Sequence, residues 1–283
     1  MLSLPKWFVA AVGVVSAGIV LCFFVFPSVL PFAACVLLLA TIVVITVAYR
    51  RAMRAFENFQ LETKARENAP LRQMQSCFWL FSRLQLRRPL PPMGGWAIGP
   101  DFAAELISIV LAAKPRVIVE ASSGVSTLLI AYCLEQLGSG SVTSLDHEQQ
   151  FADQTKQELH SHGFNEGRIN VVHAPLKTYT INGRTWKWYD TAALDHLPGP
   201  IDLLVVDGPP WYLQEQSRLP ALPLLYSKLS ADAIVVLDDA ARPGEKSIVK
   251  AWLESYPEFT EQYLEHEKGT SILRRPALFA RTT

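Results

Sequence analysis

The sequence lacks an excess of charge of either sign and has few cysteines. Its 283 residues include 26 lysines and arginines and 26 aspartates and glutamates. A protein that binds nucleic acid usually carries a basic face for the phosphates, so this balance argues against a nucleic-acid partner. The four cysteines occur without a CxxC motif or a cysteine–histidine spacing typical of zinc sites. A disulfide framework is therefore not expected, which suits a catalytic portion in the cytoplasm.

Glycine-rich turns of the kind that bind phosphate chains are missing as well. The stretch VIVEASSGVST, residues 117–127, has the order strand, turn, helix, but its turn has one glycine and no lysine. Glu120, at the end of the expected strand, would repel a pyrophosphate. The small residues after it let a ligand approach the main chain, and Ser126 and Thr127 can cap the helix that follows. The turn therefore suits a ligand with hydroxyl groups or a positive centre.

Charged residues are absent from Trp7 to Tyr49. Pro27 and Pro31 divide this segment into two apolar runs, each about as long as the ~20 residues that a helix needs to cross a bilayer. Basic residues lie before and after the segment, which places both of its ends in the cytoplasm. We therefore predict a transmembrane hairpin with two spans over residues 1–50. The alternatives are a cleaved signal peptide, against which the length of the runs argues, and a buried helical hairpin.

Residues 51–95 have a different composition, from which we predict an amphipathic linker. The stretch LRQMQSCFWLFSRLQLRR, residues 71–88, combines aromatic residues with arginines, as helices that lie on a membrane surface do. A helix packed on the following domain has the same pattern, and both interpretations stay open. The stretch PLPPMGGWAIGP, residues 89–100, then interrupts regular structure. It is either a lid over a ligand, with its glycines as hinges, or a linker.

In residues 96–283, expected strands alternate with expected helices, a pattern typical of a parallel sheet with helices on both faces. The strands are short and almost entirely apolar, as strands covered on both faces are. Helices are expected at residues 101–113, 126–138, 148–163, 221–230 and 244–256, strands at 116–121, 141–146, 168–174, 201–208 and 231–239, and a closing hairpin at 259–275. We therefore predict an α/β fold, Rossmann-like and doubly wound.

Polar residues stand at the carboxyl ends of all the expected strands before the closing hairpin. Right-handed crossovers bring these ends to one edge of the sheet, where open α/β sheets bind ligands. An acidic residue about 20 residues after the first turn is placed to accept hydrogen bonds from ribose hydroxyls, and Asp146 meets this spacing. The strand-end residues are Glu120, Asp146, His173, Asp207, Asp238 and Asp239.

Five motifs resemble, in their order, those of a known family: VIVEASSGVSTLL, VTSLDHE, VVHAPL, IDLLVVDGPP and AIVVLDDAAR. The chain from about residue 95 to about residue 275 is similar to class I S-adenosylmethionine-dependent methyltransferases, and among them to small-molecule O-methyltransferases. The resemblance implies a mostly parallel seven-stranded sheet with an antiparallel last strand. It also implies an enzyme whose cofactor is S-adenosylmethionine.

The resemblance implies roles for individual residues at the strand ends. Asp146 would hold the ribose, and Asp207 would lie near the methionine amino group and the methyl-transfer centre. Family members usually have a glycine where this chain has Ala121 and Ser122, and a serine serves in such a turn if its φ is negative. The adenine would be flanked by His147 and Ala174, and the methionine part would face Glu120, Ser122, Ser123, Gly124 and Ser126.

Methyl transfer to a hydroxyl also needs a group that takes the proton of the acceptor. The candidate catalytic residues at this edge are Asp207, Asp239 and His173. Asp238 is a candidate as well, or it only caps its loop, and Arg242 is expected to pair with Asp239 or Glu245. The aromatic stretch TWKWYD, residues 185–190, is either a wall of the acceptor pocket or an ordinary loop.

A divalent cation is a further expectation that the sequence leaves open. In related O-methyltransferases, carboxylates after the fourth and fifth strands bind such an ion, and Asp207 with Asp238 or Asp239 matches these positions. Oxygen ligands of this kind suit Mg²⁺. Those enzymes have an asparagine after the second carboxylate, however, where this chain has Asp239. The metal ligands, if any, therefore stay undetermined.

The predicted function is a membrane-anchored S-adenosylmethionine-dependent methyltransferase with a cytoplasmic catalytic domain. Its acceptor would be an oxygen or nitrogen of a small molecule or of a lipid-linked molecule that the anchor brings close. Two alternatives stay open: a non-catalytic membrane scaffold that retains the cofactor fold, and another nucleotide-binding Rossmann enzyme.

Overall fold

The computed structural model describes residues 13–14, 16–18, 20, 30–165 and 167–275. The chain divides into two compact units, Met1–Asn68 and Ala69–Thr283. Helix α2, Leu30–Arg83, begins in the first unit and ends in the second. Each unit is described separately below.

The first unit contains one helical segment, Ala34–Gln60, that is long and apolar enough to cross a membrane. Among the described residues, its apolar side chains are exposed: Leu38 is 62% exposed and Ile45 is 66% exposed. Such a surface is stable in lipid and costly in water. The other span of the predicted hairpin would be formed by the first apolar run. Most of that run lies outside the described residues, so this span stays a prediction.

The second unit is built on a seven-stranded sheet of order β3-β2-β1-β6-β7-β9-β8. Neighbouring strands from β3 to β7 are parallel, and β9 is antiparallel to both β7 and β8. This is the mostly parallel Rossmann-like sheet that the sequence predicts. The strands are β1 Val117–Ala121, β2 Ser141–Asp146, β3 Ile169–His173, β6 Ile201–Val206, β7 Leu229–Leu237, β8 Thr260–Leu264 and β9 Thr270–Arg274.

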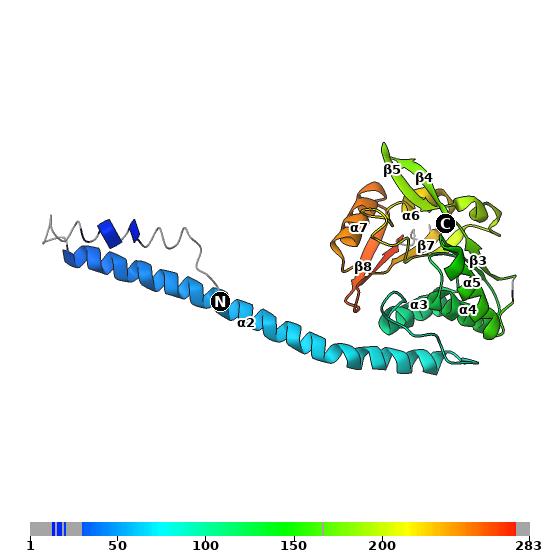
Figure 1. Cartoon of the computed structure of the whole chain (residues 1–283), viewed down its shortest axis with the longest axis horizontal. Coiled ribbons are helices and arrows are strands. Elements are labelled where there is room, and N and C mark those ends of the chain that lie inside the picture. Colours follow the sequence, from blue (N-terminus) through cyan, green and yellow to red (C-terminus); the bar gives the residue numbers. More distant parts are fainter. Residues whose placement is uncertain (1–12, 15, 19, 21–29, 166, 276–283) are drawn as a thin grey trace, which may run out of the picture. The chain divides into compact units, whose positions relative to one another are not determined.

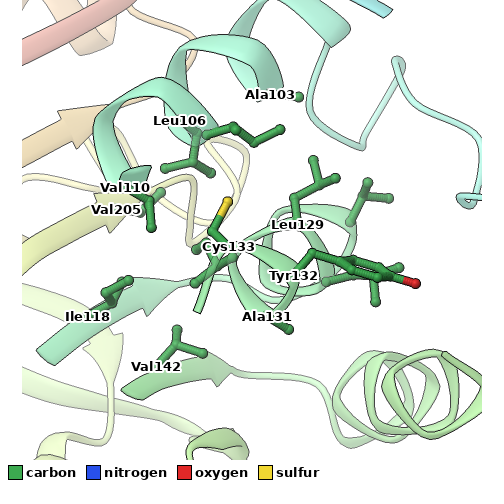
Figure 2. Packing of buried hydrophobic residues seen from close by; sticks show 14 of the residues in the cluster. Ala103, Leu106, Val110, Ile118, Leu129, Ala131, Tyr132, Cys133, Val142 and Val205 are labelled. Atoms are coloured by element: carbon green, nitrogen blue, oxygen red, sulfur yellow. The ribbon is translucent and has the colours of Figure 1, made fainter. Parts of the chain in front are cut away.

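Helices cover both faces of this sheet because alternate residues of each strand point to opposite faces. Figure 1 shows α3, α4 and α5 together on one side of the sheet and α6 and α7 on the other. In Figure 2, Leu106 and Val110 of α3 and Cys133 of α4 pack near Ile118 of β1. The bounds are α3 Pro100–Ala113, α4 Val125–Leu137, α5 Gln149–Ser161, α6 Ala221–Leu225 and α7 Pro243–Ser255, with short 3₁₀ helices at Thr191–His196 and Tyr226–Lys228.

A second, two-stranded sheet was not predicted. Strands β4, Leu176–Ile181, and β5, Arg184–Tyr189, form an antiparallel hairpin inserted between β3 and β6. Its turn consists of Asn182 and Gly183, both with positive φ, which is the residue pair that tight hairpins favour. The aromatic stretch at residues 185–190 is therefore mostly strand, and its last residues, Trp188 and Tyr189, are buried in the core.

The end of α2 packs on the rest of the second unit. Leu80 and, just after the helix, Leu84 are buried in the same hydrophobic cluster as α3 and α4, while Phe78 and Phe81 remain exposed. Of the two interpretations of residues 71–88, packing on the domain is therefore observed for one face of this segment. The opposite face keeps the aromatic residues that suggested a membrane surface.

Candidate functional site

The predicted strand-end residues lie along one edge of the main sheet. Because β3, β2, β1, β6 and β7 are parallel neighbours, their carboxyl ends are adjacent and point the same way. Asp146, Glu120 and Asp207 occupy the ends of the three central neighbours, β2, β1 and β6. These three carboxylates are therefore close together, although they are far apart in the sequence.

The turn after β1 is held by hydrogen bonds to the neighbouring strand and helix. The amide of Ser122 donates to the carbonyl of Leu145 at 2.9 Å, and the Ser123 hydroxyl donates to Asp146 Oδ2 at 2.7 Å. Ser122 has φ +121°, a conformation that side chains rarely adopt. The sequence led us to expect that a serine could serve in this turn only if its φ were negative. The φ of Ser122 is positive, so the turn keeps the geometry that glycine usually provides. Gly124, at φ +150°, ends the turn.

Glu120 lies beneath this turn rather than in front of it. Its side chain is fully buried, and its Oε2 accepts hydrogen bonds from the hydroxyls of Thr127 at 2.6 Å and Ser144 at 2.5 Å. Oε1 has no hydrogen-bond partner among the described residues. Burial raises the pKa of Glu120 to about 7, and the nearby hydroxyl groups of Ser126, Ser144 and Thr127 oppose that rise. Glu120 thus ties β1 to α4 and β2 and leaves one buried oxygen for a donor.

Asp146 and His147 stand at the end of β2. Asp146 Oδ2 accepts from Ser123, and Oδ1 accepts from the amide of Glu148 at 3.1 Å. The Nδ1 atom of His147 is buried and has no hydrogen-bond partner within the described part of the chain. Ala174, after β3, is buried and donates its amide to the Asp146 carbonyl at 2.7 Å. The predicted ribose and adenine residues are therefore neighbours.

Tyr189 enters this edge from the β4–β5 hairpin. Its ring contacts His147 edge-on, with centroids 6.0 Å apart, and its hydroxyl lies against the main chain of Gly208, the second residue after β6. A side chain at position 208 would also lie 3.3 Å from the carbonyl of Ala121 at the end of β1. Tyr189 therefore extends from the end of β2 to the end of β6, across the end of β1.

Beyond β6, an acidic cluster surrounds a buried arginine. Asp207, Asp238 and Asp239 each place one carboxylate oxygen within 4.8 Å of the others. Nη2 of Arg218 donates to Asp207 Oδ1 at 3.2 Å and to Asp239 Oδ2 at 2.7 Å, and Nη1 donates to the Asp238 carbonyl at 2.8 Å. Arg242 pairs with the same Asp239 oxygen at 2.8 Å and approaches Glu245 at 3.9 Å, as predicted.

Burial controls the protonation of this cluster. It raises the pKa of Asp207 to about 6, against the opposing charge of Arg218. Burial also raises the pKa of Asp238 well above its usual range, and the charges of Asp207 and Asp239 add to that shift. A carboxyl group with a pKa near the operating pH can accept and release a proton. Asp207 has this property.

The acidic cluster holds a guanidinium group where the divalent cation left open by the sequence would bind. Two of its carboxylate oxygens, on Asp207 and Asp239, already accept hydrogen bonds from a guanidinium group. Both carboxylate oxygens of Asp238 and Oδ1 of Asp239 are buried without a hydrogen-bond partner in the described part of the chain, but an ion bound there would lie beside the positive charge of Arg218. No step of the reaction is therefore assigned to a metal.

His173 lies apart from the acidic cluster. It is exposed at the end of β3, and β2 and β1 separate it from β6. At about 4.8 Å per strand spacing, roughly 14 Å separates the ends of β3 and β6. The structure thus does not bring His173 together with Asp207 and Asp239, the other predicted catalytic residues.

The predicted lid segment is attached to the β8–β9 turn, which lies beside the carboxyl end of β7. Nζ of Lys268, in the β8–β9 turn, donates to the carbonyls of Gly95 and Ala97 at 2.7 and 2.9 Å. Trp96 between them is 77% exposed and contacts Tyr212, in the loop after β6, edge-on at 6.0 Å. The two described surface hollows, about 570 and 610 Å³, are lined by residues other than the strand-end acids.

Comparisons with known proteins place this geometry in context. Residues 121–240 match the family described as a methyltransferase domain. No curated protein matches the sequence. The SAH-bound methyltransferase PaMTH1 of Podospora anserina is similar in structure with a TM-score of 0.51 and 16% identity, over 72% of this chain and 87% of that chain.

Two O-methyltransferases give lower scores. The enzyme from Bacillus cereus in complex with SAH has a TM-score of 0.48 and 16% identity, over 65% of this chain and 84% of that chain. TomG from Streptomyces achromogenes, in complex with SAM, has a TM-score of 0.46 and 17% identity, over 64% of this chain and 82% of that chain. The family match and the fold shared with PaMTH1 together confirm the predicted enzyme class: the chain contains a methyltransferase domain.

Proposed function

We propose that this methyltransferase domain takes its methyl group from S-adenosylmethionine and transfers it to an oxygen or nitrogen of a small acceptor. The observation that carries this proposal is the row of Asp146, Glu120 and Asp207 on three neighbouring parallel strands. Carboxylates at this spacing can accept hydrogen bonds from a ribose at one end and from an amino group at the other. PaMTH1, which shares the fold, is a methyltransferase with SAH bound.

The residues of the edge fit the polar parts of this cofactor. The buried Oε1 of Glu120 and Nδ1 of His147 have no hydrogen-bond partners among the residues that the structure describes. Asp146 would hold the ribose, His147 and Ala174 would flank the adenine, and the turn Ser122–Ser126 would lie along the methionine part. When bound, the cofactor supplies a methyl group on a positively charged sulfur.

Asp207 is the residue that we propose to take the proton of the acceptor. Its side chain is 14% exposed, whereas that of Asp239 is 5% exposed and held by two arginines. The acceptor oxygen would form its bond to the methyl carbon as the carbon–sulfur bond breaks, and its proton would pass to Asp207. Alignment of the acceptor accounts for much of the rate of such a displacement. His173 is left out of this step because of its distance.

We further propose that Ala34–Gln60 anchors the enzyme in a membrane, with the catalytic unit in the cytoplasm. The anchor favours a lipid-linked acceptor, which would diffuse in the same plane as the enzyme. Extraction of cell membranes with alkaline carbonate should leave the chain in the membrane fraction. Val43→Arg should weaken insertion by about 3 kcal/mol, the cost of an arginine at the centre of a span, whereas Val43→Leu should not. Equal release of both variants would contradict the anchor.

The test of the cofactor is direct binding by the purified full-length chain in detergent. Calorimetry should detect S-adenosylmethionine and its demethylated product, and Asp146→Asn should weaken both. Asp195→Asn is a matched control, because Asp195 pairs with Lys228 at the surface. A folded protein that binds neither S-adenosylmethionine nor its demethylated product would contradict the proposal.

A membrane scaffold without catalysis is the second candidate, and one observation favours it. Tyr189 spans the end of β1, where the cofactor would lie. If the ring stays there in the cell, the fold is retained and the site is closed. Failure of the folded wild-type protein to bind S-adenosylmethionine, with binding gained in Tyr189→Ala, would favour this candidate over an enzyme.

A further inference from the structure

We infer that Arg218 is a built-in cation that takes the place of a divalent metal in the acidic cluster and positions Asp207. The cluster of Asp207, Asp238 and Asp239 has the carboxylate spacing of a metal site. The guanidinium group of Arg218 lies among these residues and contacts all three, two through carboxylates and one through its carbonyl. The consequence for methyl transfer, that it needs no metal, rests on the proposed function.

The position of Arg218 is fixed by its neighbours in the chain. The hydroxyl of Ser217 donates to the Pro209 carbonyl at 2.8 Å, and the indole of Trp252 donates to the Leu219 carbonyl at 2.8 Å. Both residues that flank Arg218 are thus attached to other elements. Arg218 itself is 3% exposed. It is therefore a fixed part of the site rather than a surface side chain that an incoming ion could displace.

The charges of the site support the same conclusion. Arg218 and Arg242 share Oδ2 of Asp239, which gives that carboxylate two positive partners. A divalent ion on Asp207 and Asp239 would add two further positive charges next to a guanidinium that cannot lose its proton. Asp238 contributes its carbonyl, and its carboxylate oxygens have no hydrogen-bond partner in the described part of the chain. Oδ1 of Asp239 is also buried there without a hydrogen-bond partner, and an ion bound to these three oxygens would lie beside the fixed charge of Arg218.

Arg218 acts through Asp207 and is therefore a positioning residue. A guanidinium is planar and donates in fixed directions, so its bond to Oδ1 sets the orientation of the Asp207 carboxylate. Lysine would keep the charge but could not donate along all three directions. Methionine would remove the charge with little change in volume and would leave three carboxylates without a central cation.

The test uses Mn²⁺ alone, added to the full-length chain in detergent and followed by the electron paramagnetic resonance of free Mn²⁺. The wild-type chain should leave this signal unchanged, and Arg218→Met should bind about one ion per chain. Arg218→Lys should bind none. Arg87→Met is the matched control, because Arg87 pairs with Glu135 at the surface, and it should behave as the wild type.

Stoichiometric binding of Mn²⁺ by the wild-type chain, lost in Asp207→Asn, would overturn the inference. If Arg218→Met does not fold, the wild-type titration decides alone: no binding supports the inference and binding of one ion overturns it. Neither result depends on S-adenosylmethionine, so failure of the proposed function is recognised separately by cofactor calorimetry.

Activity adds a second, independent measurement once an acceptor is known. Turnover should be unchanged after dialysis against EDTA. Arg218→Met should lower kcat by about 10- to 100-fold, the effect of a small misplacement of a reacting group, with little change in KM for S-adenosylmethionine, and Arg218→Lys should restore part of it. Loss of activity in EDTA that Mg²⁺ restores would overturn the inference.

Discussion

The hydroxyl group of Tyr189 lies against the main chain of Gly208, so closely that a methyl side chain at position 208 would collide with it. This contact joins the β4–β5 hairpin to the end of β6, beside Asp207. Its consequence for binding is direct. A ligand that extends from Asp146 to Asp207 must displace the Tyr189 ring or bind around it.

The first prediction concerns the collision itself. Gly208→Ala should destabilise the catalytic unit by about 1–3 kcal/mol, the usual cost of overpacking. In a Tyr189→Phe background the same change should cost less, by at least about 0.5 kcal/mol, because the colliding oxygen is gone and residues in contact are not additive. Denaturant unfolding of the four proteins measures the difference. Equal costs in both backgrounds would show that the two residues do not touch.

Tyr189 also gives a prediction for the cofactor. Tyr189→Ala should bind S-adenosylhomocysteine more tightly than the wild type, because the ring no longer has to move. Tyr189→Phe keeps the ring and should bind like the wild type. Calorimetry on both variants separates the effect of the ring from that of the hydroxyl. Weaker binding by Tyr189→Ala would mean that the ring is part of the cofactor pocket.

Ser122 gives a prediction about backbone strain. A non-glycine residue held at φ +121° costs about 1–3 kcal/mol, and glycine adopts this conformation freely. Glycine also loses more backbone freedom on folding than serine does, which offsets part of the gain. Ser122→Gly should therefore raise the free energy of unfolding by about 1 kcal/mol. Ser123→Gly is the contrasting control, because it loses the hydrogen bond to Asp146 and should destabilise. Lower stability of Ser122→Gly than of the wild type would argue against strain at this turn.

Glu120 predicts how stability changes with pH. Burial raises its folded pKa from 4.5 to about 7, so the folded state holds the proton more tightly than the unfolded state does. Stability should therefore fall as the pH rises from about 4.5 to about 7, by at most roughly 3 kcal/mol, and stay level above that range. Asp207, with a pKa raised to about 6, adds a change of the same sign. Thermal unfolding of Glu120→Gln should show a smaller loss of stability between about pH 4.5 and about pH 7. If this variant loses as much stability as the wild type, another group causes the effect.

Two adjacent residues at the end of α2 predict opposite outcomes. Leu80 is fully buried, so Leu80→Ala should cost about 2–5 kcal/mol of stability. Phe81 is 52% exposed, and Phe81→Ala should change the free energy of unfolding by no more than about 0.5 kcal/mol. Reduced binding of the Phe81 variant to anionic vesicles, with its stability intact, would identify the exposed face as a membrane contact. Similar stability losses in both variants would contradict the packing described.

Most of the sheet was predictable because its signals are local. Apolar strands such as residues 201–206 alternate with helices, and the parallel strands end at one edge. The prediction therefore placed Asp146, Glu120 and Asp207 together. The β4–β5 hairpin was missed although it carries its own signal. Asn182 and Gly183 separate two alternating β-prone runs, and this is a recognised hairpin pattern.

Other features could not be predicted from the sequence. Arg218 is a single basic residue in a loop, and only the folded chain brings it to Asp207 and Asp239. The positive φ of Ser122 runs against the preference of serine itself, because hydrogen bonds of the surrounding turn impose it. Both residues depend on long-range contacts, and both lie at the proposed site.

The order of the strands has a consequence for biosynthesis. β9 is made after β7 and β8, yet it lies between them and pairs with both. As the ribosome releases the chain from its N-terminus, Ala34–Gln60 is available for membrane insertion long before the catalytic sheet can close. With the proposed anchor inserted, the nascent protein would be tethered while β7 and β8 stay unpaired on this side, until Thr270–Arg274 emerges. A premature stop before Thr270 would leave an open sheet edge, a surface prone to association with other chains.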